Sequence, residues 1–140
     1  MRAIRRLLMI QIALFAFAAL MHFGVLFTGH QHAAARIAET VIGAVLTAGL
    51  LAGVIRPGWT RAAAIAVQAF ALLGTCVGIV MITIGIGPRT MLDAALHASM
   101  TVALITGLWI SANASPRGAG KRTVKPPPRR RKRDLSVASG

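Results

Sequence analysis

The chain has 140 residues, 56% of them hydrophobic, and its mean hydropathy is +0.69. Only 14% of its residues are charged, whereas about 25% are charged in a typical soluble domain. Residues 7–110 hold too few charged side chains to cover a surface that faces water, which excludes an ordinary soluble domain. This composition predicts an all-α integral membrane protein.

Four apolar ranges follow one another along the chain, and each is predicted to form a transmembrane helix. They are residues 7–27, 36–55, 62–86 and 93–112. The first and third ranges are uncharged, and a helix of about 20 apolar residues crosses a hydrocarbon core of about 30 Å. The second range reaches that length only with Arg36 and Glu39 at the membrane interface.

The links between the four ranges are short and contain the turn-forming pairs Pro57-Gly58 and Gly87-Pro88. Short links place consecutive helices antiparallel to each other. We therefore expect residues 1–112 to form one transmembrane domain, an up-down-up-down bundle of four helices surrounded by the lipid bilayer.

The basic residues predict the orientation of this domain in the membrane. Of the sixteen Lys and Arg residues, all except Arg36 and Arg89 fall on one side of the predicted helices. Basic residues accumulate on the cytoplasmic side, so both termini are predicted to lie in the cytoplasm of a bacterium, with the helices in its inner membrane. A cleaved signal peptide ending near Ala18 is the alternative, but the apolar range continues past that point and favours a retained helix.

Residues 113–140 differ in composition from the rest of the chain. They are rich in proline and arginine and cannot bury apolar area, which predicts a disordered cytoplasmic tail. Its basic run is expected to contact anionic lipids. That run is Arg129, Arg130, Arg131, Lys132 and Arg133. Because no aromatic residues are interleaved with it, we do not expect it to bind nucleic acid.

Small residues in the second and third ranges predict close helix packing. Gly49 and Gly53 are four residues apart, as are Gly74 and Gly78, so each pair gives one helix a small-residue groove. These grooves fit contacts within the bundle, a homo-oligomer or a larger membrane complex. Gln68 is expected to form a hydrogen bond between helices, and it is the polar residue assigned to the inner half of the membrane.

Ionisable residues gather near the extracytoplasmic ends of the predicted helices. The candidate cluster is His22, Glu39, Asp93 and His97. Ionisable groups inside a membrane are costly and commonly face the bundle interior, so a functional site is the first hypothesis.

A metal or haem site is one interpretation of this cluster. Asp93 and His97 are spaced i,i+4 and share a helix face, as two ligands of one ion would. The additional candidate ligands are His30, His32, Met81 and Met100. Imidazole and thioether ligands together suit copper or haem iron, and imidazole with carboxylate suits zinc.

A purely structural role is the competing interpretation. Arg36 is spaced i,i+3 from Glu39, and Arg89 is spaced i,i+4 from Asp93, so each acid has a predicted charge partner on its own helix. In this interpretation His22 and His97 bond to each other or to a backbone carbonyl.

The chain carries no phosphate-binding glycine loop, nucleophile elbow or HExxH motif, so it is not expected to be an enzyme. An accessory or assembly protein of the inner membrane is the first prediction. A protein that handles metal or haem is the second, and a small proton- or solute-coupled transporter is the third. In size and plan, over about residues 7–112, the chain resembles small multidrug transporters and DoxX-like proteins. The first range has Gln11 and His22 where the drug transporters use a glutamate.

Overall fold

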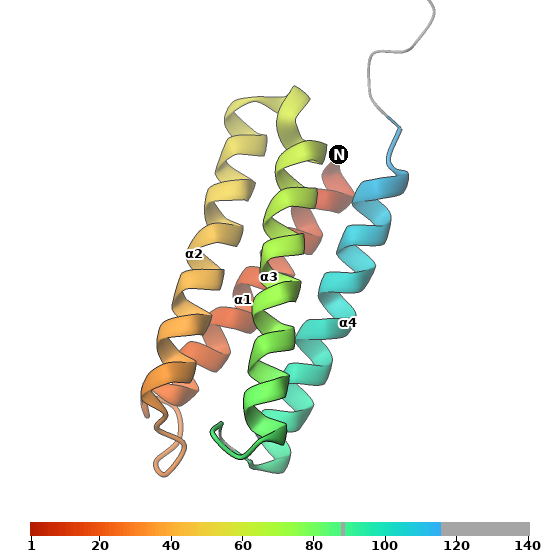
Figure 1. Ribbon diagram of the computed structural model, residues 1–140. Helices are drawn as coiled ribbons and strands as arrows, with labels where there is room; N and C mark the ends of the chain where they lie inside the picture. The colour runs from red at the N-terminus through yellow and green to blue at the C-terminus, as the bar shows by residue number, and fades with distance from the viewer. Residues whose placement is uncertain (88, 116–140) are drawn as a thin grey trace, which may run out of the picture.

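The computed structural model describes residues 1–87 and 89–115, and over these residues it is helical without strands. Figure 1 shows its elements: α1 (Arg2–His22), α2 (Ala33–Ile55), the single turn η1 (Pro57–Trp59), α3 (Thr60–Thr83) and α4 (Met91–Asn113). The four α-helices are each long and apolar enough to cross a membrane. The predicted fold class is confirmed to this extent, and the helices indicate a multi-pass membrane protein.

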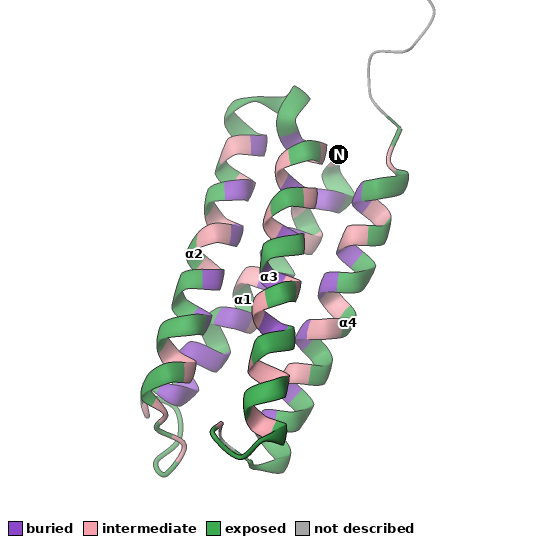
Figure 2. Ribbon diagram, viewed as in Figure 1, coloured by how far each residue is buried: buried purple, intermediate pink, exposed green. Residues whose placement is uncertain are grey.

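The four α-helices lie side by side, and each runs opposite to the one before it (Figure 1). α1 packs on α2, α2 on α3 and α3 on α4, and α4 returns to α1. Figure 2 shows the buried positions on the sides of the helices that face one another. Many large apolar side chains point outward instead, such as Leu73 at 66% and Trp109 at 68% exposure. An apolar exterior of this kind fits contact with lipid.

α1 is displaced toward the N-terminus relative to the predicted range 7–27. The basic residues from Arg2 onward join the helix, and the helix ends at His22 instead of Phe27. Gly24 has a φ of +77°, a left-handed conformation that glycine adopts at helix ends. The chain then folds back, and the His32 backbone N–H donates to the His22 carbonyl at 3.2 Å. His22 is therefore the last residue of α1 and is covered by the following loop.

The link between α3 and α4 also differs from the predicted boundaries. α3 ends at Thr83, three residues before the predicted end, and Gly85 follows with a φ of +92°. α4 begins at Met91 because Thr90 and Asp93 form a capping box. In this box the Thr90 hydroxyl accepts from the Asp93 N–H, and the Asp93 carboxylate accepts from the Thr90 N–H.

The predicted small-residue grooves lie inside this chain. A Cβ added at Gly49 on α2 would meet Val67 of α3 at 2.6 Å, and one at Gly74 on α3 would meet Ile42 of α2 at 2.8 Å. Each helix thus inserts a branched side chain where its neighbour has no side chain. Gly53 faces Thr60 at the start of α3, and Gly78 faces His97 of α4.

Most of the predicted C-terminal tail, including its basic run, lies outside the described residues. The run is Arg129, Arg130, Arg131, Lys132 and Arg133. Within the tail range, Asn113 is the last residue of α4 and only the next two residues are also described.

Candidate functional site

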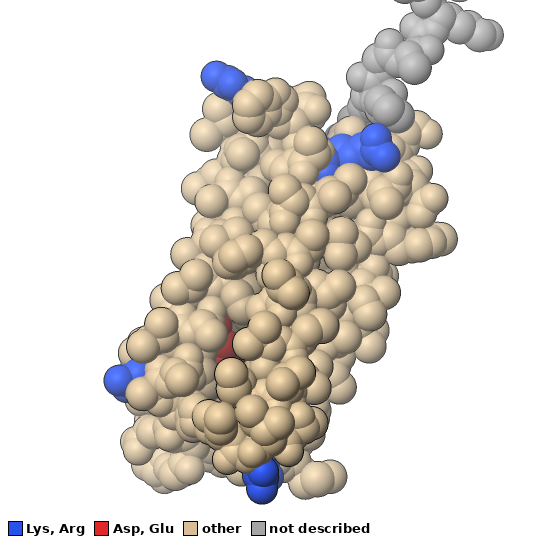
Figure 3. Space-filling model, viewed as in Figure 1, with Lys and Arg blue, Asp and Glu red and all other residues tan. Residues whose placement is uncertain are grey.

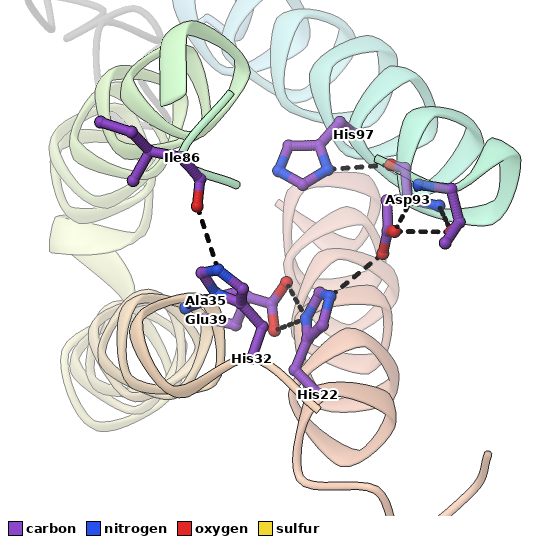
Figure 4. Close-up of polar contacts among 8 residues, drawn as sticks. His22, His32, Ala35, Glu39, Ile86, Asp93 and His97 are labelled. Carbon is purple, nitrogen blue, oxygen red and sulfur yellow. Dashed lines mark hydrogen bonds and ion pairs between the residues drawn. The ribbon is translucent and has the colours of Figure 1, made fainter. Parts of the chain in front are cut away.

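A histidine between two carboxylates joins three helices near one end of the molecule. His22 Nδ1 lies 2.9 Å and 2.8 Å from the two carboxylate oxygens of Glu39, and His22 Nε2 lies 3.1 Å from Asp93 Oδ1. Figure 4 shows the imidazole of α1 between the acid of α2 and the acid of α4. His22 and Asp93 are each 1% exposed and Glu39 is 6% exposed. We call these three residues the acid–histidine cluster.

Local structure positions each member of the acid–histidine cluster. His22 is held where α1 ends, and Glu39 lies in the second turn of α2 and faces α1. Asp93 is fixed by the capping box, and its second oxygen also accepts a hydrogen bond from the Thr90 hydroxyl. Asp93 therefore bonds to both His22 and Thr90, whereas both carboxylate oxygens of Glu39 face His22.

The proton balance of the acid–histidine cluster follows from this geometry. An imidazole donates from both nitrogens only when it is doubly protonated, so the first arrangement is one imidazolium between two carboxylates. If the imidazole is neutral, the nitrogen without hydrogen can face a carboxyl group only if that group carries the proton. Both arrangements leave one net negative charge in a buried, apolar setting.

His32 and His97 have defined tautomers when they are neutral. His97 Nδ1 lies 2.9 Å from the Asp93 backbone carbonyl, which can only accept, so Nδ1 carries the hydrogen and Nε2 has a lone pair. His32 Nδ1 accepts from the Ala35 N–H, so its Nε2 carries the hydrogen and donates to the Ile86 carbonyl at 3.2 Å. His97 thus retains an unused acceptor, whereas both His32 nitrogens are engaged.

A cavity of about 310 Å³ lies beside the acid–histidine cluster. Its walls come mainly from α2, α3 and α4 and include the small residues Ala38, Gly74 and Gly78. Glu39 and His97 both line it among mostly apolar side chains. Figure 3 shows an acidic side chain recessed between α2 and α3 on a face that is otherwise uncharged along its middle. We call this space the outer cavity.

The predicted charge pairs are not the pairs that form. The guanidinium of Arg36 lies over the Phe23 ring, 5.2 Å from its centroid, and Arg89 donates to the Ile82 carbonyl at 3.3 Å. The ion pairs of the described residues join both acids to His22 instead. An arginine at a helix end can extend to the surface, so it does not accompany a carboxylate that points into the interior.

The predicted hydrogen bond between His22 and His97 is also replaced by other contacts. Both nitrogens of His22 face carboxylates, and His97 bonds to the backbone of its own helix. His97 and Asp93 share a helix face, but the Asp93 carboxylate points to His22 whereas the His97 ring lines the outer cavity (Figure 4).

The candidate metal ligands are brought together only in part. Among residues 1–87 and 89–115, no three His, Cys, Asp or Glu side chains are arranged to hold a metal ion. Met81 and Met100 line the outer cavity together with His97 and His32. His30 lies apart in the loop after α1, with its ring 6.2 Å from that of Phe27.

A second polar layer, of which the sequence predicted only Gln68, joins three helices toward the other end of the molecule. Gln11 Nε2 donates to Gln68 Oε1 at 3.0 Å and to the Ala103 carbonyl at 2.8 Å. Gln68 Nε2 donates to Ser111 Oγ at 3.1 Å, which confirms the predicted interhelical bond of Gln68. Gln11 is a strongly polar residue in an uncharged range, and that alone could have indicated its role. We call Gln11, Gln68 and Ser111 the glutamine layer.

No protein-family model, curated protein or solved structure matches this chain.

Proposed function

We propose that the chain is a multi-pass protein of the bacterial inner membrane, an up-down-up-down bundle with both termini in the cytoplasm. The distribution of arginines supports this orientation. Arg2, Arg5 and Arg61 meet at one end of the molecule, whereas the acid–histidine cluster and Arg89 belong to the other. By the positive-inside rule, the end with the basic residues lies at the cytoplasmic interface. The acid–histidine cluster, at the other end, then lies near the periplasmic interface.

We further propose that the protein is a non-enzymatic accessory protein that binds a small amphipathic cation in the outer cavity. One observation carries this proposal: the buried Glu39 carboxyl group, which shares the single imidazole of His22 with Asp93, lines a cavity that is otherwise mostly apolar. A buried charge without compensation is costly, so a bound cation gains both the ion pair and the apolar contacts.

The size and lining of the outer cavity narrow the ligand class. A volume of about 310 Å³ is at the small end of ligand pockets, which suits a compact molecule with a single amine and an apolar body. The lone pair of His97 Nε2 gives the cavity a second acceptor for an N–H donor. The Glu39 carboxyl group and His97 Nε2 therefore both favour a ligand that donates hydrogen bonds.

The test compares three ligands that share a phenethyl body and differ in the charge of their polar group. Full-length protein in a mild detergent is titrated with phenethylamine, phenethyl alcohol and phenylpropionate, and binding is measured by calorimetry. We expect the amine to bind most tightly. Glu39→Gln keeps the shape of the side chain and should remove the preference for the amine over the alcohol. Equal binding of all three ligands to the unaltered protein would contradict the proposal.

A blocking variant identifies the site independently of charge. Ala38 lines the outer cavity and is exposed, so Ala38→Phe should obstruct it and reduce binding of the amine. Ala44→Phe is the matched control, because Ala44 is also exposed on α2 but does not line the cavity. If both variants bind the amine normally, the ligand is held elsewhere.

A soft metal ion is a second candidate ligand. His97 Nε2, Met81 and Met100 line the same cavity, and imidazole with two thioethers is a donor set that favours Cu(I) over zinc. Copper content after incubation with Cu(I), compared between unaltered protein and Met100→Leu, tests this candidate. The leucine keeps the apolar volume of Met100 and removes its sulfur, so copper retained in full by Met100→Leu would argue against the site.

Transport is the least supported of the candidate functions. The glutamine layer corrects the expectation that Gln68 alone is polar in the inner half, so polar groups do occur at two depths. Phe15 lies between Gln11 and His22 on α1, Met100 lies between Asp93 and Ser111 on α4, and both apolar side chains are buried. A path for a polar solute needs polar groups along its length, and this apolar separation favours binding over transport.

A further inference from the structure

A basic pocket lies at the end of the molecule opposite the acid–histidine cluster. It has a volume of about 600 Å³ and is formed by the start of α1, the turn η1 and the start of α3. Three arginines line it: Arg2, Arg5 and Arg61. Pro57, Gly58 and Ile65 form other parts of its wall. We propose that this basic pocket binds the phosphate-bearing headgroup of an anionic phospholipid.

Two of the arginines are fixed in place by backbone carbonyls at helix ends. Arg5 Nη2 donates to the Gly53 carbonyl at 2.7 Å, near the end of α2. Arg61 donates to the Ser111 carbonyl at 3.1 Å and the Ala112 carbonyl at 2.8 Å, at the end of α4. These bonds satisfy carbonyls that helix ends leave open, and they also hold both guanidinium groups in position before any ligand binds.

The anchored arginines retain donors for a ligand. A guanidinium has five N–H groups, and the bonds above use one from Arg5 and two from Arg61. Arg5 Nε is buried and has no hydrogen-bond partner in the described structure. A phosphate, which accepts several hydrogen bonds at once, matches such a set of oriented donors.

The charges of the basic pocket have no acidic partner among the described residues. The acids described are Glu39 and Asp93, and both bond to His22 near the starts of α2 and α4, whereas the pocket lies by the opposite ends of those helices. The N-terminal end of α3 adds partial positive charge at the same place. A bound anion would therefore neutralise the positive charge of the basic pocket.

The surroundings favour a lipid over a soluble anion. The pocket lies at an end of apolar helices, where a phospholipid headgroup would lie, and Ile65 continues its wall down the side of α3. Basic pockets between transmembrane helices at the cytoplasmic side commonly hold anionic headgroups. This site is separate from the outer cavity and does not depend on the proposed cation.

The experiment uses the full-length protein in a mild nonionic detergent and measures lipid binding by native mass spectrometry. Phosphatidylglycerol is titrated beside phosphatidylcholine with the same acyl chains, and glycerol phosphate serves as the soluble headgroup. We expect tight binding of phosphatidylglycerol alone. Arg2→Gln should weaken it about fivefold, the effect expected for one basic residue near an anionic lipid.

Arg6→Gln is the matched control, because Arg6 also lies in the first turns of α1 but does not line the pocket. The C-terminal tail is the same in both variants, so its contribution cancels. Equal weakening in Arg2→Gln and Arg6→Gln would show general surface charge and overturn the proposal. Binding of phosphatidylcholine with the same affinity, or of glycerol phosphate as tightly as the lipid, would overturn it as well.

Discussion

His22 Nε2 lies 3.1 Å from Asp93 Oδ1, which joins the last residue of α1 to the first turn of α4 across 71 positions of the chain. The same ring reaches Glu39 of α2 through Nδ1 at 2.8 Å. One side chain therefore links three helices where they meet. The consequences for stability can be tested separately from any ligand.

Removing the imidazole should destabilise the protein strongly. His22→Ala leaves two carboxylates buried near each other without the group between them, and breaking a buried ion pair typically costs about 3–5 kcal/mol. We expect a clear fall in the midpoint of thermal unfolding in detergent. His32→Ala is the comparison and should cost less, because the His32 side chain bonds only to the Ala35 N–H, as the N-cap of α2, and to the Ile86 carbonyl, and its ring lies at the edge of the cluster. An unchanged midpoint in His22→Ala would mean that the cluster contributes little to stability.

Neutralising Asp93 should cost more than neutralising the arginine once expected to pair with it. Asp93→Asn loses the charged hydrogen bond to His22 and weakens the capping box of α4, which should cost about 2 kcal/mol. Arg89→Gln removes an exposed hydrogen bond to the Ile82 carbonyl and should change stability by less than about 0.5 kcal/mol. The free energy of unfolding of the two variants is measured side by side by chemical unfolding. Equal losses would contradict this prediction and favour an ion pair between Arg89 and Asp93.

Gly107 should be required for the glutamine layer. A Cβ at this position on α4 would clash with both Gln68 Oε1 and Gln11 Nε2, so Gly107→Ala must displace the hydrogen bond between these two amides. We expect a loss of about 1–3 kcal/mol from overpacking. Gly58→Ala is the control, since nothing lies within 4 Å of the added Cβ. The double variant Gly107→Ala, Gln68→Ala should recover part of the loss if the clash is its cause.

The proposed orientation predicts opposite labelling of two loops. In a Cys76→Ala background, a cysteine at Gln31 should react with a membrane-impermeant thiol reagent applied from the periplasm. A cysteine at Gly58, in the turn between α2 and α3, should react only after the inner membrane is opened. The basic asymmetry is the physical reason for this difference. Reaction of Gly58→Cys in intact spheroplasts would reverse the assignment.

The sequence by itself determined the helical class and the four helices that are long and apolar enough to cross a membrane, because hydropathy is summed over neighbouring residues and needs no partner. The ends of the helices could be predicted less well from the sequence. α1 ends five residues before its apolar range does, since Gly24 adopts a positive φ while Phe23 through Phe27 remain apolar in a folded loop.

Only the tertiary structure decided the partners of the buried polar groups. Sequence spacing pointed Glu39 to Arg36 and Asp93 to Arg89, yet both carboxylates turn inward to His22 while the arginines remain near the helix ends. A buried carboxylate must find a partner that is buried with it, and that partner is fixed by which helices pack together. Separation along the chain carries no information about this, so a histidine from α1 took the place of the two nearest arginines.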